Sequence, residues 1–183
     1  TRKRLRLRQD KLGVVTMLKS SQRLKIRGRC VKDVVTISGF VQDAIIAADE
    51  MTFEQENRRF VAILNRFMWE RADPSTLPES AQDEQADAKF EDASDGKYWR
   101  VQSALVVERA SSAKRKGIQP QPNKSLPGKD EFHYLLSIVP EGDQLTPYFA
   151  GGGMIMLAGP ALEVFLEDLS DPWPTPQMPV HPD

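Results

Sequence analysis

The sequence contains very few of the residues that form disulfides and metal sites. Its 183 residues include one cysteine, Cys30, and two histidines, His133 and His181. An intramolecular disulfide is therefore excluded, and a single thiol is typical of a reducing compartment. Metal centres need clustered His, Cys or carboxylate ligands, so we predict neither a metal nor another cofactor. We interpret Cys30 as an inert small residue and His133 as a surface histidine on the polar face of a strand.

Long apolar runs and a strong net charge are also missing. Arg, Asp and Glu interrupt every hydrophobic stretch, and none approaches the about 20 apolar residues that cross a membrane. The formal net charge is -1, which argues against a basic domain that coats nucleic acid. The hydrophobic fraction of 40% and the charged fraction of 28% are typical of a globular domain. Any link to a membrane is therefore expected to go through a partner.

Charge is unevenly distributed along the chain. Between Thr1 and Arg29 the only acidic residue is Asp10, and lysine or leucine alternates with four arginines: Arg2, Arg4, Arg6 and Arg8. This period-two pattern suits a segment that adds a strand to a neighbour or follows an acidic surface. An Arg-rich, acid-poor segment is also typical of an organellar presequence, or of the residues that follow its cleavage site. The alternative is a solvated basic tail.

Composition divides the chain into a domain and its appendages. Residues 1–23 form a basic N-terminal arm, and residues 24–170 form a single α+β domain. Within this domain, residues 72–96 are an acidic insertion with too few apolar residues to form a core, so we assign no secondary structure to it. Residues 171–183 are a Pro-rich C-terminal tail, which is expected to be extended.

Two helices are predicted, one near each end of the domain. Asp33 fits the N-cap of a helix that runs to about Ala48, with apolar side chains at helical spacing: Val34, Ile37, Val41, Ala44, Ile45 and Ala48. Pro160 fits the first turn of a second helix. Its apolar residues follow the spacing i, i+3, i+4, i+7: Leu162, Phe165, Leu166 and Leu169.

The sequence between the two predicted helices contains several strand patterns. Residues 51–53 and 59–70 predict a hairpin whose second arm is nearly continuously apolar, as in a central strand. Two further strands are predicted from alternating apolar residues: Trp99, Val101, Leu105 and Val107 in one, and Phe132, Tyr134, Leu136 and Ile138 in the other. Residues 146–150 and 154–157 flank the Gly151–Gly153 run and form either two short strands or one kinked strand. Residues 110–129 are interpreted as a polar loop.

This order predicts an α+β fold with a mainly antiparallel sheet, an N-terminal helix and a C-terminal helix. Two arrangements of the sheet remain open. It is either an open sheet or a pleckstrin-homology-like partial barrel that the last helix closes.

The residues that carry chemistry form no catalytic constellation. Consecutive glycines can bring backbone N–H groups to an anion. The Gly151–Gly153 run lacks the Lys-Ser/Thr and the glycine spacing of phosphate loops, so we interpret it as a bend. Arg66 and Arg100 either bind an anion or pair with Glu70 or Glu108, and ion pairing is the favoured interpretation. We therefore predict that the protein is not an enzyme and has no catalytic residue.

Four strings occur together in a familiar order. Residues 35–44 read Val-Thr-Ile-Ser-Gly-Phe-Val-Gln-Asp-Ala, and residues 58–70 read Arg-Arg-Phe-Val-Ala-Ile-Leu-Asn-Arg-Phe-Met-Trp-Glu. Residues 149–153 read Phe-Ala-Gly-Gly-Gly, and residues 162–173 contain Leu-Glu-Asp-Leu followed by Pro-Trp. In this order the strings resemble the domain-of-unknown-function 2948 family, typical of alphaproteobacteria, over about residues 24–173. The resemblance implies no activity, and no catalytic residue is transferred from it.

The chain departs from the compact bacterial pattern in its basic arm, its larger acidic insertion and its Pro-rich tail. Mitochondria descend from an alphaproteobacterium, so the resemblance and the presequence-like arm together imply the mitochondrial matrix side. The alternative location is the bacterial cytoplasm.

The leading hypothesis is a non-catalytic supernumerary subunit of a large mitochondrial assembly, on the matrix side of a respiratory-chain complex. Its partners would be other protein subunits, contacted by both ends of the chain: Arg2, Arg4, Arg6, Arg8, Trp173 and Pro174. The first alternative is a peripheral RNA-associated subunit of a mitochondrial ribosome, with Lys114, Arg115 and Lys116 also on phosphates. The second is a free bacterial small-ligand-binding domain that uses Gly151–Gly153 with Arg66 or Arg100.

Overall fold

The computed structural model describes residues 23–72, 98–118 and 132–179. These residues form one α-helix, three short 3-10 helices and eleven strands. The α-helix is α2 (Val31–Val41), and the 3-10 helices are η1 (Ala48–Glu50), η2 (Trp69–Arg71) and η5 (Ala150–Gly152). The strands are β1 (Lys25–Gly28), β2 (Ala44–Ala47), β3 (Met51–Glu54), β4 (Arg59–Phe67), β5 (Tyr98–Glu108), β6 (Ser112–Lys116), β7 (Phe132–Glu141), β8 (Gln144–Phe149), β9 (Met154–Ala158), β10 (Glu163–Asp168) and β11 (Trp173–Thr175).

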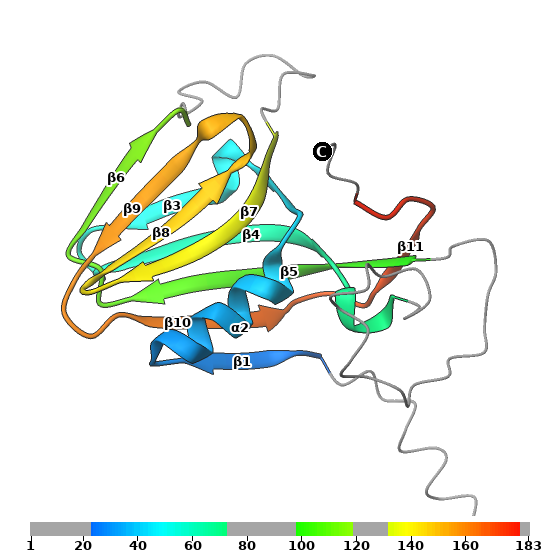
Figure 1. Cartoon of the computed structure of the whole chain (residues 1–183), viewed down its shortest axis with the longest axis horizontal. Helices are drawn as coiled ribbons and strands as arrows, with labels where there is room; N and C mark the ends of the chain where they lie inside the picture. Colours follow the sequence, from blue (N-terminus) through cyan, green and yellow to red (C-terminus); the bar gives the residue numbers. More distant parts are fainter. Residues whose placement is uncertain (1–22, 73–97, 119–131, 180–183) are drawn as a thin grey trace, which may run out of the picture.

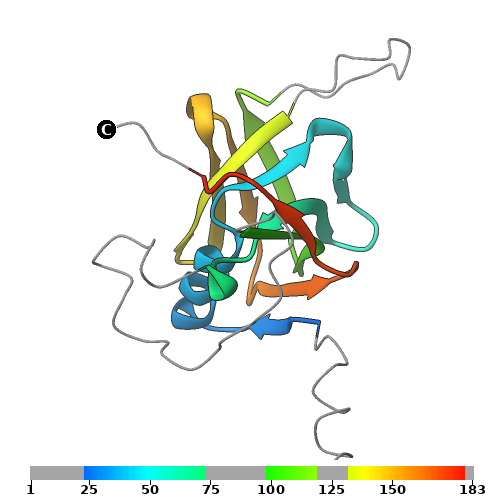
Figure 2. The same cartoon turned by 90° about the vertical axis from the view of Figure 1, so that its right-hand side faces the viewer.

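All strands belong to one antiparallel sheet, in the order β1-β10-β5-β4-β2-β7-β8-β9-β6. Two strands lie off this path, because β3 pairs with β4 and β11 pairs with β5. The sheet is strongly curved, and β6 and β9 fold back toward the side where β3 lies (Figure 1). Figure 2 shows the same curvature from the side.

The core lies on the concave side of the sheet, where α2 covers it. The buried face of α2 consists of the predicted residues Val34, Ile37 and Val41. These side chains belong to one cluster with buried residues of the surrounding strands, among them Leu64, Leu105, Leu135, Leu157 and Leu166. Helical spacing therefore identified the buried face of this helix correctly.

The boundaries of α2 differ from the prediction at both ends. The helix begins at Val31 with Cys30 as its N-cap, and Asp33 is its third residue. The Asp33 carboxylate accepts hydrogen bonds from the backbone N–H groups of Arg29 and Cys30, at 2.9 and 3.2 Å. The helix ends at Val41 because the following residues form β2, which pairs with β7. Ala44 and Ile46 are buried there on a two-residue period rather than a helical one.

The predicted C-terminal helix is wrong, and with it the predicted fold class. Residues 163–168 form β10, which pairs with β1 on one side and β5 on the other. Its inward side chains are Val164, Leu166 and Asp168, all buried. Burial thus repeats every two residues, as in a strand, and not at helical spacing. Hydrogen-bond partners on both edges favour a strand over a short helix that would satisfy its own backbone. The described residues form a curled antiparallel sheet with one α-helix, which lies near the N-terminal side of the domain.

The predicted hairpin and alternating strands correspond to β3, β4, β5 and β7. Residues 112–116 form β6, although we interpreted residues 110–129 as a loop. The strand has no apolar alternation because most of its side chains are exposed. The Gly151–Gly153 run is a bend between β8 and β9, as predicted, with Gly151 and Gly152 at φ values of 77° and 82°.

The orientation of β7 is the reverse of the predicted one at its start. Phe132, Tyr134 and Leu136 are 54%, 49% and 37% exposed, whereas His133 and Leu135 are 7% and 0% exposed. A register shift between Leu135 and Ser137 turns the strand, so that Ile138 is buried as predicted. His133 is therefore not a surface histidine; its ring lies 5.9 Å from that of Phe149. Hydrophobicity alone did not identify which face of this strand packs on the core.

Candidate protein-binding surface

Arg66 of β4 lies at the centre of a buried network of charged groups. Its side chain is 0% exposed. Its Nε and Nη2 donate to the two carboxylate oxygens of Asp168 at 2.9 and 2.8 Å. Its Nη1 and Nη2 donate to the carboxylate of Glu70 at 3.0 and 2.8 Å. Two bidentate contacts hold the guanidinium in one orientation.

Asp168 receives two further hydrogen bonds, from the hydroxyl of Ser103 at 2.7 Å and the backbone N–H of Leu24 at 3.1 Å. Burial opposes ionisation of this carboxyl, but the hydrogen bonds from Arg66 and Ser103 outweigh burial and hold the pKa of Asp168 below its usual value. The network joins β4, β5 and β10 with Leu24, the residue that precedes β1. The predicted pairing of Arg66 with Glu70 is confirmed. Because two carboxylates already neutralise Arg66, it is not available to bind an external anion.

Arg100 lies on the outer face of β5 and does not pair with Glu108. Its Nη1 donates to the backbone carbonyls of Asn65 and Asp43 at 3.1 and 3.4 Å, and its guanidinium lies 5.7 Å from the centre of the Phe67 ring. Burial lowers the pKa of Arg100, and the charge of Asp43 acts in the opposite direction. Glu108 lies at the other end of β5, opposite Arg59.

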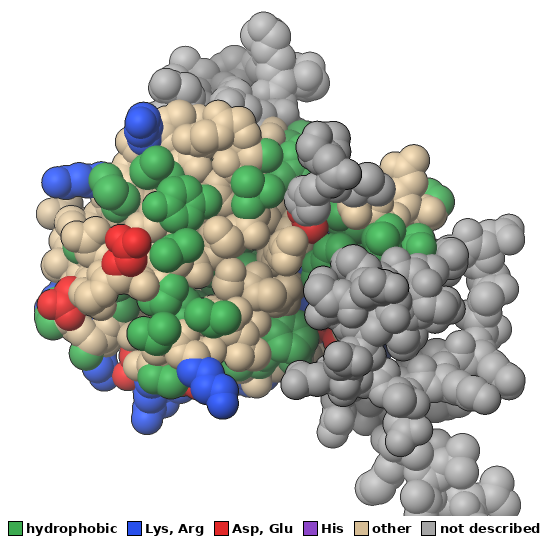
Figure 3. Space-filling view, in the orientation of Figure 1, with side chains coloured by type: hydrophobic (Ala, Val, Ile, Leu, Met, Phe, Trp, Pro, Cys, Tyr) green, Lys and Arg blue, Asp and Glu red, His purple; other side chains and the backbone are tan. Residues whose placement is uncertain are grey.

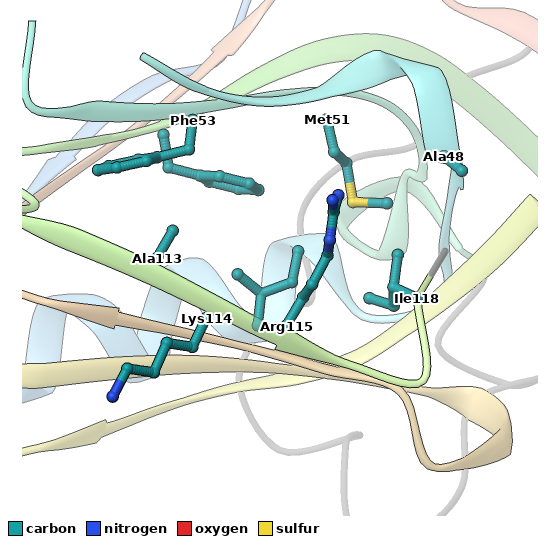
Figure 4. A pocket seen from close by; sticks show the side chains of 9 residues that line it. Ala48, Met51, Phe53, Ala113, Lys114, Arg115 and Ile118 are labelled. Carbon is teal, nitrogen blue, oxygen red and sulfur yellow. The ribbon is translucent and has the colours of Figure 1, made fainter. Parts of the chain in front are cut away.

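A cavity of about 290 Å³ lies between β3 and β6. Ala48, Met51 and Phe53 form one wall, Ala113, Lys114 and Arg115 the other, and Phe60, Ile118 and Ile155 complete the lining. In Figure 4 the Arg115 side chain extends across the cavity toward Met51, whereas Lys114 points away from it. Most of the lining side chains are thus apolar, and the Arg115 side chain brings a positive charge into the cavity.

The strand beside this cavity carries an uncompensated positive charge. Lys114, Arg115 and Lys116 are consecutive and exposed. None of them forms an ion pair with another residue of the described ranges. Two other exposed cations are paired by contrast: Lys25 contacts Glu167 at 3.0 Å, and Arg109 contacts Glu163 at 3.1 Å. The basic character of β6 is therefore available to a partner.

The outer face of β7 to β9 is an exposed apolar surface. It carries the residues that the strand pattern had assigned to the core, Phe132, Tyr134 and Leu136, together with Met156 of β9 at 37% exposure. The space-filling view shows hydrophobic side chains spread over this side of the molecule (Figure 3). Its charged side chains lie mainly toward the left and lower edges of the view. We name the four residues the outer apolar face.

The predicted partner-binding residues are only partly described. Arg2, Arg4, Arg6 and Arg8 lie outside the described residues. Trp173 and Pro174 belong to β11, opposite Arg100 and Trp99 of β5. Both are exposed, Trp173 at 37%, so pairing with β5 leaves their side chains on the surface.

The remaining sequence candidates fall in separate places. Gly153 lies near Ile118 and Phe149, and a β-carbon at Gly153 would approach the Ile118 side chain to 3.2 Å. The contacts of Arg66 are instead with Asp168, Glu70 and the Phe40 ring, so the glycine bend and this arginine do not form one site. Cys30 is exposed at the start of α2. Within the described ranges, no group of three or more His, Cys, Asp or Glu residues is arranged to hold a metal ion.

Sequence reasoning missed Asp168 and Ser103, and it missed the outer apolar face. Asp168 was placed in a helix, but Val164, Leu166 and Asp168 alternate with polar or half-buried residues, and this is a strand signal. The outer apolar face had no local signal, because the same alternation describes a strand facing in either direction.

A family model described as protein of unknown function (DUF2948) matches residues 24–181 of the chain. The chain therefore belongs to the DUF2948 family, as the four strings implied. No curated protein and no solved structure matches the chain. No helix in the described part of the chain is long and apolar enough to cross a membrane.

Proposed function

We propose that this member of the DUF2948 family is a non-catalytic accessory subunit of a larger protein assembly, which it joins through the outer apolar face. The observation that carries the proposal is the orientation of β7, whose Phe132, Tyr134 and Leu136 face solvent. Exposed hydrophobic side chains are ordinary when they are isolated, but a contiguous group on one face is typical of an interaction site.

The composition of the outer apolar face suits a protein partner. Interface cores are enriched in aromatic residues and methionine and depleted of charged residues. Phe132 and Tyr134 of β7 and Met156 of β9 provide this chemistry, on two strands that β8 separates. Each Å² of apolar surface that a partner covers contributes about 25 cal/mol before the costs of association.

The charged groups support a structural rather than a catalytic role. Arg66 and Asp168 are locked together by hydrogen bonds, and both pKa shifts favour the charged forms that maintain this ion pair. Such a network holds β4, β5 and β10 together. It leaves no unpaired arginine at that place, because Asp168 and Glu70 both accept hydrogen bonds from Arg66.

The identity of the assembly is the part of the proposal that rests on sequence alone. We propose the matrix side of a mitochondrial respiratory-chain complex because segment 1–23 is presequence-like. In this arrangement the folded domain docks through the outer apolar face, and the arm and the Pro-rich tail contact neighbouring subunits.

The test is native isolation of the endogenous protein in mild detergent, at low and then at high salt, with its companions identified by mass spectrometry. Hydrophobic docking predicts stable co-migration with respiratory-complex subunits through high salt. A monomer at low salt contradicts the accessory-subunit proposal.

A matched pair of variants separates the outer apolar face from the rest of the surface. Tyr134→Asp places a charge in the centre of the face and is expected to reduce incorporation into the assembly by more than half. Gln55→Asp adds the same charge at an exposed position of the turn between β3 and β4 and is expected to leave incorporation unchanged. Equal incorporation of both variants would show that another surface holds the domain.

The second candidate function is an RNA-associated subunit of a ribosome, and the basic residues of β6 favour it. Lys114, Arg115 and Lys116 offer charges to phosphates without competing ion pairs in the described structure. Phosphate contacts release counterions, so this function predicts that ribosomal companions are lost steeply as salt increases. Companions that remain through high salt contradict it.

A further inference from the structure

The curled sheet leaves two strand edges facing one cavity. Among the described residues, β3 pairs with β4 alone and β6 pairs with β9 alone. Residues of both strands line the cavity of about 290 Å³, with β3 and β6 on opposite sides of it (Figure 4). A strand edge without a neighbour presents backbone N–H and C=O groups that an extended peptide can pair with.

The two faces of β6 differ in chemistry along a period of two. Lys114 and Lys116 lie opposite Met156 and Met154 of β9, on the outer side of the sheet. Ala113 and Arg115 lie on the other side, against the cavity, as Figure 4 shows for Arg115. A strand added beside β6 would therefore meet two lysines with one set of its side chains. Its other set would meet the cavity, whose lining is mainly apolar side chains together with Arg115.

This arrangement defines the occupant. Cross-strand pairs of opposite charge are favourable and those of like charge are unfavourable, so residues opposite Lys114 and Lys116 should be acidic. The alternate residues should be apolar, because Met51, Phe53 and Ile155 line the space that they enter. Lysines on an edge strand also repel an identical edge, which disfavours a second copy of β6.

We propose that the opening between β3 and β6 binds an extended segment of a partner protein, with acidic and apolar residues in alternation, as an added strand. The segment extends β6, its acidic side chains pair with Lys114 and Lys116, and its apolar side chains fill the cavity. This site uses different residues from the outer apolar face, so either site can fail without the other.

The experiment uses the full-length chain and three fluorescent heptapeptides. The first alternates Asp or Glu with Val or Leu, the second has the same composition with its acids grouped together, and the third replaces the acids of the first with Lys. We expect micromolar affinity for the first peptide alone, measured by fluorescence anisotropy. Amide NMR shifts on its addition should map to β3, β6 and the cavity.

Two variants test the two halves of the site. Lys114→Glu/Lys116→Glu is expected to weaken binding of the first peptide by about tenfold, since it turns two attractive pairs into repulsive ones. Ala113→Phe fills the cavity and should weaken binding by a similar factor. Lys32→Glu reverses an exposed charge on α2 and should leave the affinity unchanged. Unchanged melting temperatures establish that the variants fold.

Several results would overturn the proposal. Equal binding of the alternating and grouped peptides would reduce the site to non-specific charge attraction. Amide shifts confined to the outer face, or binding of the lysine peptide, would exclude strand addition at β6. A single-stranded RNA oligonucleotide that binds β6 more tightly than the acidic peptide would assign the basic edge to RNA.

Discussion

Strands β5 and β7 have the same kind of alternating sequence but opposite relations to the core. On β5 the apolar residues Val101, Leu105 and Val107 are each 1% exposed. On β7 the apolar residues Phe132 and Tyr134 are about half exposed, while His133 is buried between them. Alternation thus establishes that a strand has two unlike faces. The neighbours of the strand determine which of these faces becomes part of the core.

The difference follows from the position of each strand in the sheet. β5 is flanked by β4 and β10 along most of its length. Its inward side chains belong to the same core cluster as the buried residues of α2. β7 is held in register by β2, with Ile46 opposite His133 and Ala44 opposite Leu135. This register directs Leu135 into the core and leaves Tyr134 outside. A solvent-exposed aromatic row therefore has a structural cause and is available for binding.

The largest effect on stability is expected for Asp168, the buried carboxylate of β10 that lies beside β5. Asp168→Ala leaves the buried Arg66 with one carboxylate partner, and it should lower the free energy of unfolding by about 3–5 kcal/mol. Chemical denaturation measures this change. Glu167→Ala removes the adjacent exposed carboxylate, which pairs with Lys25, and should cost less than about 1 kcal/mol. Equal losses would mean that the Arg66 network is not a stabilising centre.

The next largest effect compares the two strands directly. Leu105→Ala on β5 should cost about 2–5 kcal/mol, because it removes buried methyl groups and leaves a cavity. Tyr134→Ala on β7 should change the stability of the isolated protein by no more than about 0.5 kcal/mol. Denaturation midpoints of the two variants test the contrast. A comparable loss for Tyr134→Ala would show that the outer face contributes to the fold rather than to binding.

A smaller effect is expected where the turned part of β7 contacts α2. The backbone N–H of Ile138 donates to the hydroxyl of Ser38 at 2.8 Å. Ser38→Ala removes this acceptor and should lower the free energy of unfolding by about 1–3 kcal/mol. Thr36→Ala removes an exposed hydroxyl of the same helix and is the matched control. Amide exchange at Ile138 should accelerate in Ser38→Ala alone, and unchanged exchange would argue against this contact.

The smallest expected effect is a change in how the stability of the fold depends on pH. The pKa of Asp168 is lower in the folded than in the unfolded chain, so its contribution is complete above its unfolded pKa and declines as the pH falls through its folded pKa. The stability difference between the wild type and Asp168→Asn should therefore shrink below about pH 3.9. Thermal unfolding from neutral to acidic pH measures it. A constant difference would contradict the ion pair as its source.

Features that depend on residues close in the chain were predicted correctly, whereas features that depend on distant residues were not. The buried face of α2, the β3–β4 hairpin and the glycine bend depend on residues close in the chain, and they were predicted correctly. The C-terminal helix was wrong because Leu162, Phe165, Leu166 and Leu169 fit a helical face, while β1 and β5 supply strand partners from distant segments. β6 was missed because an edge strand with exposed side chains needs no apolar pattern.

The sequence by itself determined the family, the alternating strands and the residues of α2 that face the core, because short-range spacing encodes these features. The tertiary structure alone decided that Phe132, Tyr134 and Leu136 face solvent, that Arg66 meets Asp168, and that β6 borders an apolar cavity. Arg66 and Asp168 are 102 residues apart in the chain. Strand pairing brings such groups together, and no local pattern specifies the register in which it does so.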